Sequence, residues 1–97
     1  MPIMNNICII GDGGWGTTLA ILLSKKGFNA TIWGAFPDYI AVLKTKKENE
    51  KFLPGVKIPD KIKFTSSMAE ALNGKELVIL AVPSQFVRGV PAYLFRK

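Results

Sequence analysis

The sequence IGDGGWGTTLA, residues Ile10–Ala20, decides the fold that we predict for this chain. It holds Gly11, Gly13 and Gly16 in the spacing G-x-G-x-x-G. The apolar run Ile7–Ile10 precedes it, and leucines at helical spacing follow it. Strand, glycine turn and helix, in this order, are the context in which the spacing indicates a dinucleotide-binding loop.

Each glycine has a physical reason in such a loop. We expect Gly11 to permit the tight turn out of the strand, Gly13 to let a pyrophosphate approach the backbone, and Gly16 to let the helix pack close to the strand. The free N–H groups of the first helical turn then face the phosphates, and the helix dipole favours the negative charge. A glycine-rich turn that binds no ligand is the alternative interpretation.

The remainder of the chain alternates between strand and helix patterns. Four strands are predicted, at Ile7–Gly11, Asn29–Trp33, Lys61–Thr65 and Leu77–Val82. Four helices are predicted, at Trp15–Lys26, from Pro37 into the charged run Lys44–Lys51, from a cap at Ser66 or Ser67 to Asn73–Gly74, and at Gln85–Leu94 with a break at Pro91. The segment Phe52–Gly55 is predicted to be a turn.

This order predicts an α/β fold with a Rossmann-like, partial doubly wound parallel sheet and helices on both faces. The right-handed crossover rule gives the strand order 3-2-1-4. A complete doubly wound domain usually adds two strands beside the fourth. We therefore expect the fourth strand to be an apolar edge that favours a dimer or an aggregate, or that is covered by a repositioned last helix.

Composition restricts the classes of function. Hydrophobic residues make up 48% and charged residues 21%, as in ordinary globular proteins. The net charge of +6 comes with a lysine-rich stretch, which we interpret as a solvated face rather than a nucleic-acid site. Histidine is absent, which excludes a histidine triad, and we find no metal-site pattern. The single cysteine, Cys8, is predicted to pack in the core and indicates a reducing compartment. No apolar run is long enough to span a membrane.

Four short motifs resemble the start of NAD-dependent glycerol-3-phosphate dehydrogenases. The glycine loop ends in the W-G-T element of that family at Trp15–Thr17, and the second strand ends in Trp33. Asn49–Gly55, followed by Ile58-Pro59, is similar to the family pattern N-x-x-[YF]-L-P-G-x-x-[LI]-P. Ala81–Phe86 resembles its V-P-[SH]-Q-F element.

The resemblance implies an oxidoreductase that interconverts glycerol 3-phosphate and dihydroxyacetone phosphate with NAD. The candidate cofactor-binding residues are Gly11, Asp12, Gly13, Gly14, Trp15, Gly16, Phe36, Pro83 and Phe86. In this family the lysine that acts on the substrate lies beyond the next strand, and a helical C-terminal domain completes the substrate site. We therefore interpret residues 1–97 as an incomplete N-terminal dinucleotide-binding domain, assign no catalytic residue, and expect the 97-residue chain to be inactive by itself.

The chain departs from the usual pattern in the residues around the glycine loop. Asp12 places a carboxylate in the phosphate loop, which would repel a pyrophosphate unless it points to solvent. The second strand ends in Gly34-Ala35, with neither an acid for the ribose hydroxyls nor an arginine for a 2′-phosphate. The nearest acid, Asp38, suits a helix start better. The missing basic residue favours NAD, and NADP stays open.

Other functions remain as alternatives. A stand-alone nucleotide-binding module without chemistry is the main one, followed by another dehydrogenase of the β-hydroxyacid type. A nucleic-acid module based on the net charge is the weakest. For the leading interpretation we expect a dinucleotide and the glycerol 3-phosphate pair as ligands and a homo-oligomer, with neither nucleic acid nor a membrane span. We expect a cytoplasmic location, with a glycosome still open.

Overall fold

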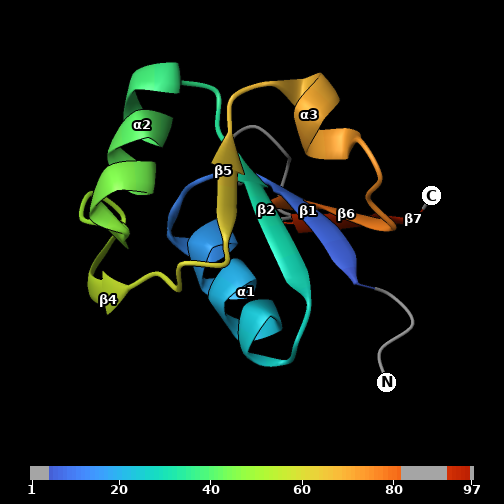
Figure 1. The fold of residues 1–97 in the computed structure, drawn as a ribbon, viewed down its shortest axis with the longest axis horizontal. Helices are drawn as coiled ribbons and strands as arrows, with labels where there is room; N and C mark the ends of the chain where they lie inside the picture. The colour runs from blue at the N-terminus through green and yellow to red at the C-terminus, as the bar shows by residue number, and fades with distance from the viewer. Residues whose placement is uncertain (1–4, 82–91, 97) are drawn as a thin grey trace.

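The computed structural model describes residues 5–81 and 92–96, which form a sheet with helices around it (Figure 1). The elements in chain order are β1 (Asn6–Ile10), α1 (Gly14–Lys25), β2 (Asn29–Trp33), α2 (Pro37–Lys46), β3 (Glu48–Asn49), β4 (Leu53–Lys57), β5 (Lys63–Thr65), α3 (Met68–Leu72), β6 (Leu77–Ala81) and β7 (Ala92–Arg96). The main sheet has the order β5-β2-β1-β6-β7, and β3 pairs with β4 separately.

The four strands β5, β2, β1 and β6 are parallel, which confirms the predicted order 3-2-1-4. Ile10 at the end of β1 lies opposite Trp33 in β2 and Leu80 in β6. The carboxyl ends of these strands therefore meet at one edge of the sheet. The Gly11 N–H continues the ladder there by donating to the Trp33 carbonyl at 2.8 Å.

Helices cover both faces of the sheet, as a doubly wound fold requires. Alternate side chains of β1 point to opposite faces, because the side-chain period of a strand is two residues. Ile7 and Ile9 pack in the larger apolar cluster with residues of α1 and α2. Cys8 and Ile10 pack in the smaller cluster with Ala71 of α3. Cys8 is fully buried, as predicted, and burial raises the pKa of its thiol.

The end of the chain differs from the prediction. A helix was expected over Gln85–Leu94, but residues 92–96 form β7, which pairs antiparallel with β6. The rest of the expected helix, with its cap Ser84 and its break at Pro91, lies outside the described residues. The outer backbone groups of β6 need partners, and a paired strand satisfies them directly. The apolar edge predicted for the fourth strand is therefore covered by a strand.

A second difference is the short antiparallel pair β3–β4, where the sequence predicted the fading end of a helix and a turn. α2 ends at Lys46, and Lys47 has the left-handed conformation with φ of 55°. The pair carries a register shift at Glu48/Asn49. Pro54 and Gly55 lie inside β4, and both residue types are rare in strands, which hid this element from sequence reasoning.

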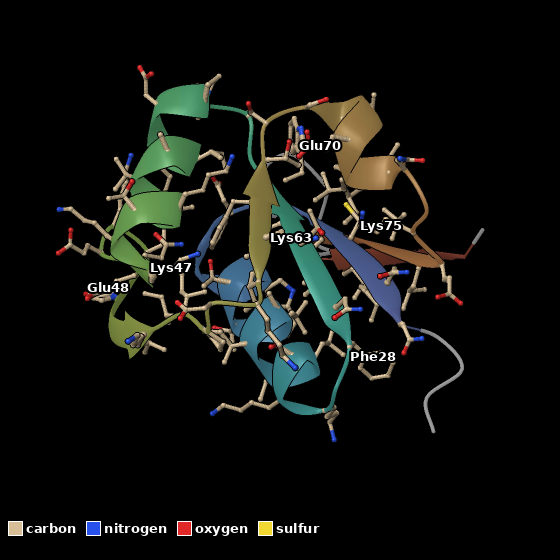
Figure 2. All side chains as sticks on the ribbon, in the orientation of Figure 1. Phe28, Lys47, Glu48, Lys63, Glu70 and Lys75 are labelled. Atoms are coloured by element: carbon tan, nitrogen blue, oxygen red, sulfur yellow. The ribbon has the colours of Figure 1, made fainter. Side chains whose placement is uncertain are left out.

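The cap of α3, the length of β5 and the exposure of the lysines can also be compared with the predictions. The Ser67 hydroxyl accepts a hydrogen bond from the Glu70 N–H at 3.2 Å and so caps α3, one of the two predicted caps. β5 is two residues shorter than predicted. Figure 2 shows charged side chains around the outside of the molecule, and most lysines of the lysine-rich stretch are exposed to solvent. Its exposed members are Lys44, Lys46, Lys51, Lys57, Lys61 and Lys63.

Close packing of α1 on β1 depends on Gly16, as the sequence indicated. A Cβ at this position would lie 3.1 Å from the Gly11 carbonyl carbon, closer still to its oxygen, and 3.4 Å from Ile9 Cγ2. The nearest obstacle is backbone, which cannot rotate away as a side chain can.

We expect Gly16→Ala to lower the free energy of unfolding by about 1–3 kcal/mol, because the helix must move away from the strand. Gly13→Ala is the matched control, since a Cβ there has nothing within 4 Å. Its stability should stay within about 1 kcal/mol of the parent chain. Urea denaturation followed by circular dichroism measures both. Equal destabilisation by the two substitutions would contradict the packing role of Gly16.

Candidate functional site

The glycine loop lies at the carboxyl edge of the sheet, between β1 and α1. Gly11 has φ of +133°, which strongly favours glycine. A Cβ on Gly11 would lie 2.9 Å from the Ala81 carbonyl carbon and closer still to its oxygen. The loop therefore passes over the end of β6, on the other side of β1 from β2. The strand order reverses at this point of the sheet. Open α/β sheets bind their ligands at such a point.

Gly13 is the one loop glycine that the packing of the described residues does not require. It is the N-cap of α1, its φ of −74° suits any residue, and a Cβ there would meet nothing within 4 Å. In the described structure no side chain caps this helix end, and its first turn contains no acid. The first N–H groups of α1 lack intrahelical acceptors. Open space beside Gly13, together with free N–H groups in the first turn of α1, fits a phosphate group.

The buried side chain of Asn49 holds the loop in place. Its amide nitrogen donates to the Asp12 carbonyl at 2.7 Å and to the Thr17 hydroxyl at 2.8 Å. Its amide oxygen accepts from the Phe52 N–H at 3.3 Å and from the Tyr39 hydroxyl. These four bonds use the two donors and two lone pairs of an asparagine side chain. Asn49 thus joins the loop, α1, α2 and the β3–β4 connection.

The β3–β4 connection also packs directly on the loop. A Cβ on Gly14 would lie 2.8 Å from the Phe52 carbonyl oxygen. Asn49 was not among the predicted site residues, although it lies in the motif Asn49–Gly55. The signal in the sequence is an uncharged polar residue between Glu48 and Glu50, but two of its hydrogen-bond partners are 32 and 37 residues away in the chain.

The carboxylate of Asp12 does not point freely to solvent. A solvent-facing carboxylate was the one arrangement in which Asp12 would not repel a pyrophosphate. Its Oδ2 atom is buried and, in the described structure, has no hydrogen-bond partner. It lies against Gly34 after β2, where a Cβ would be 2.9 Å from Asp12 Cγ and closer to Oδ2. Burial raises the pKa of Asp12, against smaller lowering effects of its own backbone N–H and of Lys51.

Exposed aromatic side chains occur on the segments beside the loop. Trp15 is 50% exposed in the first turn of α1, so packing between helix and sheet does not account for its whole side chain. Phe36 is 70% exposed at the N-cap of α2, two residues after Gly34. Both offer apolar faces that a planar ligand can cover. Pro83 and Phe86 lie outside the described residues, so their place beside a cofactor stays a prediction.

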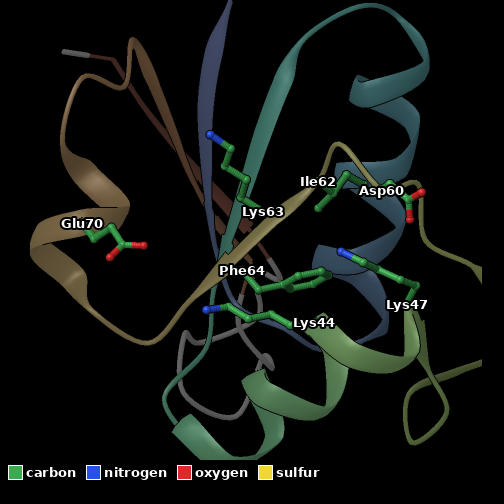
Figure 3. A pocket seen from close by; sticks show the side chains of 7 residues that line it. All are labelled: Lys44, Lys47, Asp60, Ile62, Lys63, Phe64 and Glu70. Carbon is green, nitrogen blue, oxygen red and sulfur yellow. The ribbon is translucent and has the colours of Figure 1, made fainter.

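A separate cavity of about 400 Å³ lies along β5, away from the glycine loop (Figure 3). Lysines from α2 and β5 border it, together with two carboxylates. Its lining residues are Lys44, Lys47, Asp60, Ile62, Lys63, Phe64 and Glu70. β5 is an outer strand of the sheet, and lysines at such an edge discourage pairing with other chains. This mixed-charge hollow lacks the free helix N–H groups of the glycine loop.

Metal-binding clusters and membrane-spanning helices are absent from residues 5–81 and 92–96. No group of three or more histidine, cysteine or acidic side chains is arranged to hold a metal ion. None of the helices there has both the length and the apolar content needed to cross a bilayer.

Comparison with known proteins agrees with this geometry. The family described as NAD-dependent glycerol-3-phosphate dehydrogenase N-terminus matches residues 6–95. The chain belongs to this family. That membership confirms the resemblance predicted from the motifs.

Relatives within the family are similar in sequence and in structure. A glycerol-3-phosphate dehydrogenase [NAD(P)+] of Syntrophomonas wolfei is 47% identical over 90% of this chain and 25% of its own length. One of Citrifermentans bemidjiense is 46% identical over 87% of this chain and 25% of its own length. The crystal structure of glycerol-3-phosphate dehydrogenase from Coxiella burnetii superposes with a TM-score of 0.79 at 30% identity, covering 86% of this chain and 26% of that one. The chain spans about a quarter of the length of these relatives.

We expect Asn49→Asp to lower the free energy of unfolding of the chain by about 2–5 kcal/mol. The aspartate keeps the shape but loses both donated bonds and places a negative charge beside the Asp12 carbonyl oxygen. Asn29→Asp, at an exposed residue of β2, is the control and should change stability by less than about 1 kcal/mol. Chemical denaturation measures both. An Asn49→Asp protein as stable as the control would show that the four bonds do not hold the loop.

The raised pKa of Asp12 predicts a pH-dependent effect of Asp12→Asn. A carboxyl whose pKa is higher in the folded than in the unfolded state lowers stability when it is ionised. The substitution should therefore stabilise the fold at pH 7. The gain should shrink as the pH falls through the folded-state pKa and vanish near the ordinary value of 3.8, where both states bind the proton. Thermal melts between pH 4 and 7 test this, and a gain that grows at low pH would contradict it.

Proposed function

We propose that this chain is the NAD-binding portion of a glycerol-3-phosphate dehydrogenase, an oxidoreductase that interconverts glycerol 3-phosphate and dihydroxyacetone phosphate. The observation that carries the proposal is the open position at Gly13. A glycine that the described packing does not require stands at an uncapped helix N-terminus, at the point where the strand order reverses. A bound pyrophosphate explains that choice of residue.

The glycine loop would hold the dinucleotide through its backbone. The first N–H groups of α1 take the pyrophosphate, and the helix dipole adds to the attraction. Trp15 and Phe36 supply apolar surface beside it, and Pro83 and Phe86 complete the proposed set. When bound, the nicotinamide supplies the hydride chemistry of the reaction. The residues of this chain bind and orient the cofactor and keep the loop rigid through Asn49.

Turnover requires more than the cofactor site. The relatives extend well beyond the matched region, which covers about a quarter of their length. We propose that residues 1–97 are an incomplete dinucleotide-binding domain that binds cofactor without reducing dihydroxyacetone phosphate. A homo-oligomer belongs to the same proposal, because β7 is an outer strand of the sheet and outer strands favour association. A cytoplasmic location is supported by the buried free Cys8.

Calorimetric titration of the purified chain with NADH tests the binding proposal. We expect saturable binding that is weakened at least tenfold by Gly13→Val, since the new side chain fills the space in front of the helix N–H groups. The extended backbone at Gly13 suits valine, so the fold should be kept, with a loss of stability of about 1 kcal/mol at this N-cap position. Ala69→Val, at an exposed site on α3, is the control and should bind as the parent chain does. Equal binding by Gly13→Val, or no binding by the folded parent chain, would refute the proposed site.

A further inference from the structure

The carboxylate of Asp12 is an unsatisfied group next to the proposed site. Three buried side-chain atoms in the described residues lack a hydrogen-bond partner, and Asp12 Oδ2 is the one that belongs to a charged group. A buried carboxylate oxygen that lacks a donor among the described residues is costly, and a donor supplied by a ligand would relieve that cost. Lys51 is the cation that acts on it electrostatically, but no ion pair joins the two in the described structure.

The position of this oxygen indicates what the partner is. It lies against Gly34, the first residue after β2, where dinucleotide-binding domains commonly place an acid for the ribose hydroxyls. Here Gly34-Ala35 provides neither that acid nor an arginine for a 2′-phosphate. Asp12 brings a carboxylate to the same end of β2 from the glycine loop.

Gly34 makes this arrangement possible. A Cβ at Gly34 would lie 2.7 Å from Ile40 Cδ1 and in severe overlap with the Asp12 carboxylate. A larger residue after β2 would therefore displace Asp12 from this place. The Asp12 backbone is fixed as well, because its carbonyl accepts hydrogen bonds from Asn49 at 2.7 Å and from the Thr17 hydroxyl at 3.4 Å.

We propose that Asp12 is a specificity-determining residue that selects NAD(H) over NADP(H). Its carboxylate accepts hydrogen bonds from the adenosine ribose hydroxyls and repels a 2′-phosphate. The inference rests on the proposed dinucleotide site and deepens it. In this proposal Asp12 does not act on the pyrophosphate, for which an acid is unfavourable. It binds the ribose at the end of the neighbouring strand β2.

The test compares the dissociation constants of NADH and NADPH for the parent chain, for Asp12→Asn and for Asp38→Asn as the matched control. Asp38 is an exposed acid in the first turn of α2. We expect the parent chain to prefer NADH at least tenfold, as loss of a bond to a charged group implies. Asp12→Asn should weaken NADH, tighten NADPH and reduce the preference at least tenfold. Asp38→Asn should leave the preference unchanged.

The outcomes separate this inference from the proposal on which it rests. If Asp12→Asn tightens both cofactors equally, the carboxylate acts on the pyrophosphate and the inference is wrong. An unchanged ratio in a variant that still melts cooperatively also overturns it, while the dinucleotide site stands. A folded parent chain that binds neither cofactor refutes the proposed function and, with it, this inference.

Discussion

The four hydrogen bonds of the Asn49 side chain are the constraint on which the rest of the site depends. They tie the loop carbonyl of Asp12 and the Thr17 hydroxyl of α1 to Tyr39 of α2 and to the backbone of Phe52. A loop built largely of glycine loses much conformational entropy on ordering, and glycine supplies no side chain to hold it. One buried amide with every donor and acceptor used supplies the missing rigidity from outside the loop. The short β3–β4 pair then has a clear purpose, since it carries Asn49 to this place.

Close contacts with neighbouring backbone or side-chain atoms explain why glycine occupies most positions around the loop. Gly16 lets α1 touch the end of β1, Gly14 admits the Phe52 carbonyl, and Gly34 leaves room for the Asp12 carboxylate. Of the loop glycines, Gly13 alone has no atom of the described residues within 4 Å of the position that a Cβ would take. In the proposed site, stability and binding oppose each other at Asp12: burial disfavours its ionised form, and a hydroxyl-bearing ligand would relieve that cost. Strained or unsatisfied groups of this kind concentrate at functional sites.

Local patterns predicted the features that depend on local physics. The glycine spacing, the apolar run Leu77–Val82 and a cap at Ser66 or Ser67 indicated the parallel sheet, its order and the first three helices correctly. Features that depend on distant partners were missed. β7 forms because the outer edge of β6 needs a partner, which no helical pattern in its own sequence reveals. The role of Asn49 depends on partners 32 and 37 residues away, and the direction of the Asp12 side chain depends on the space at Gly34.

Dinucleotide binding at the glycine loop is tested most plainly by a ¹⁵N–¹H correlation spectrum of the chain during titration with NADH. The proposed ligand site is at the uncapped end of α1, so the amide resonances of Gly13, Gly14 and Trp15 should move most, in proportion to saturation. The amides of Lys44, Lys47 and Lys63 around the cavity beside β5 should stay in place. Shifts confined to those three lysines, with the glycine loop unmoved, would show that NADH binds in the mixed-charge hollow and would contradict the proposed site.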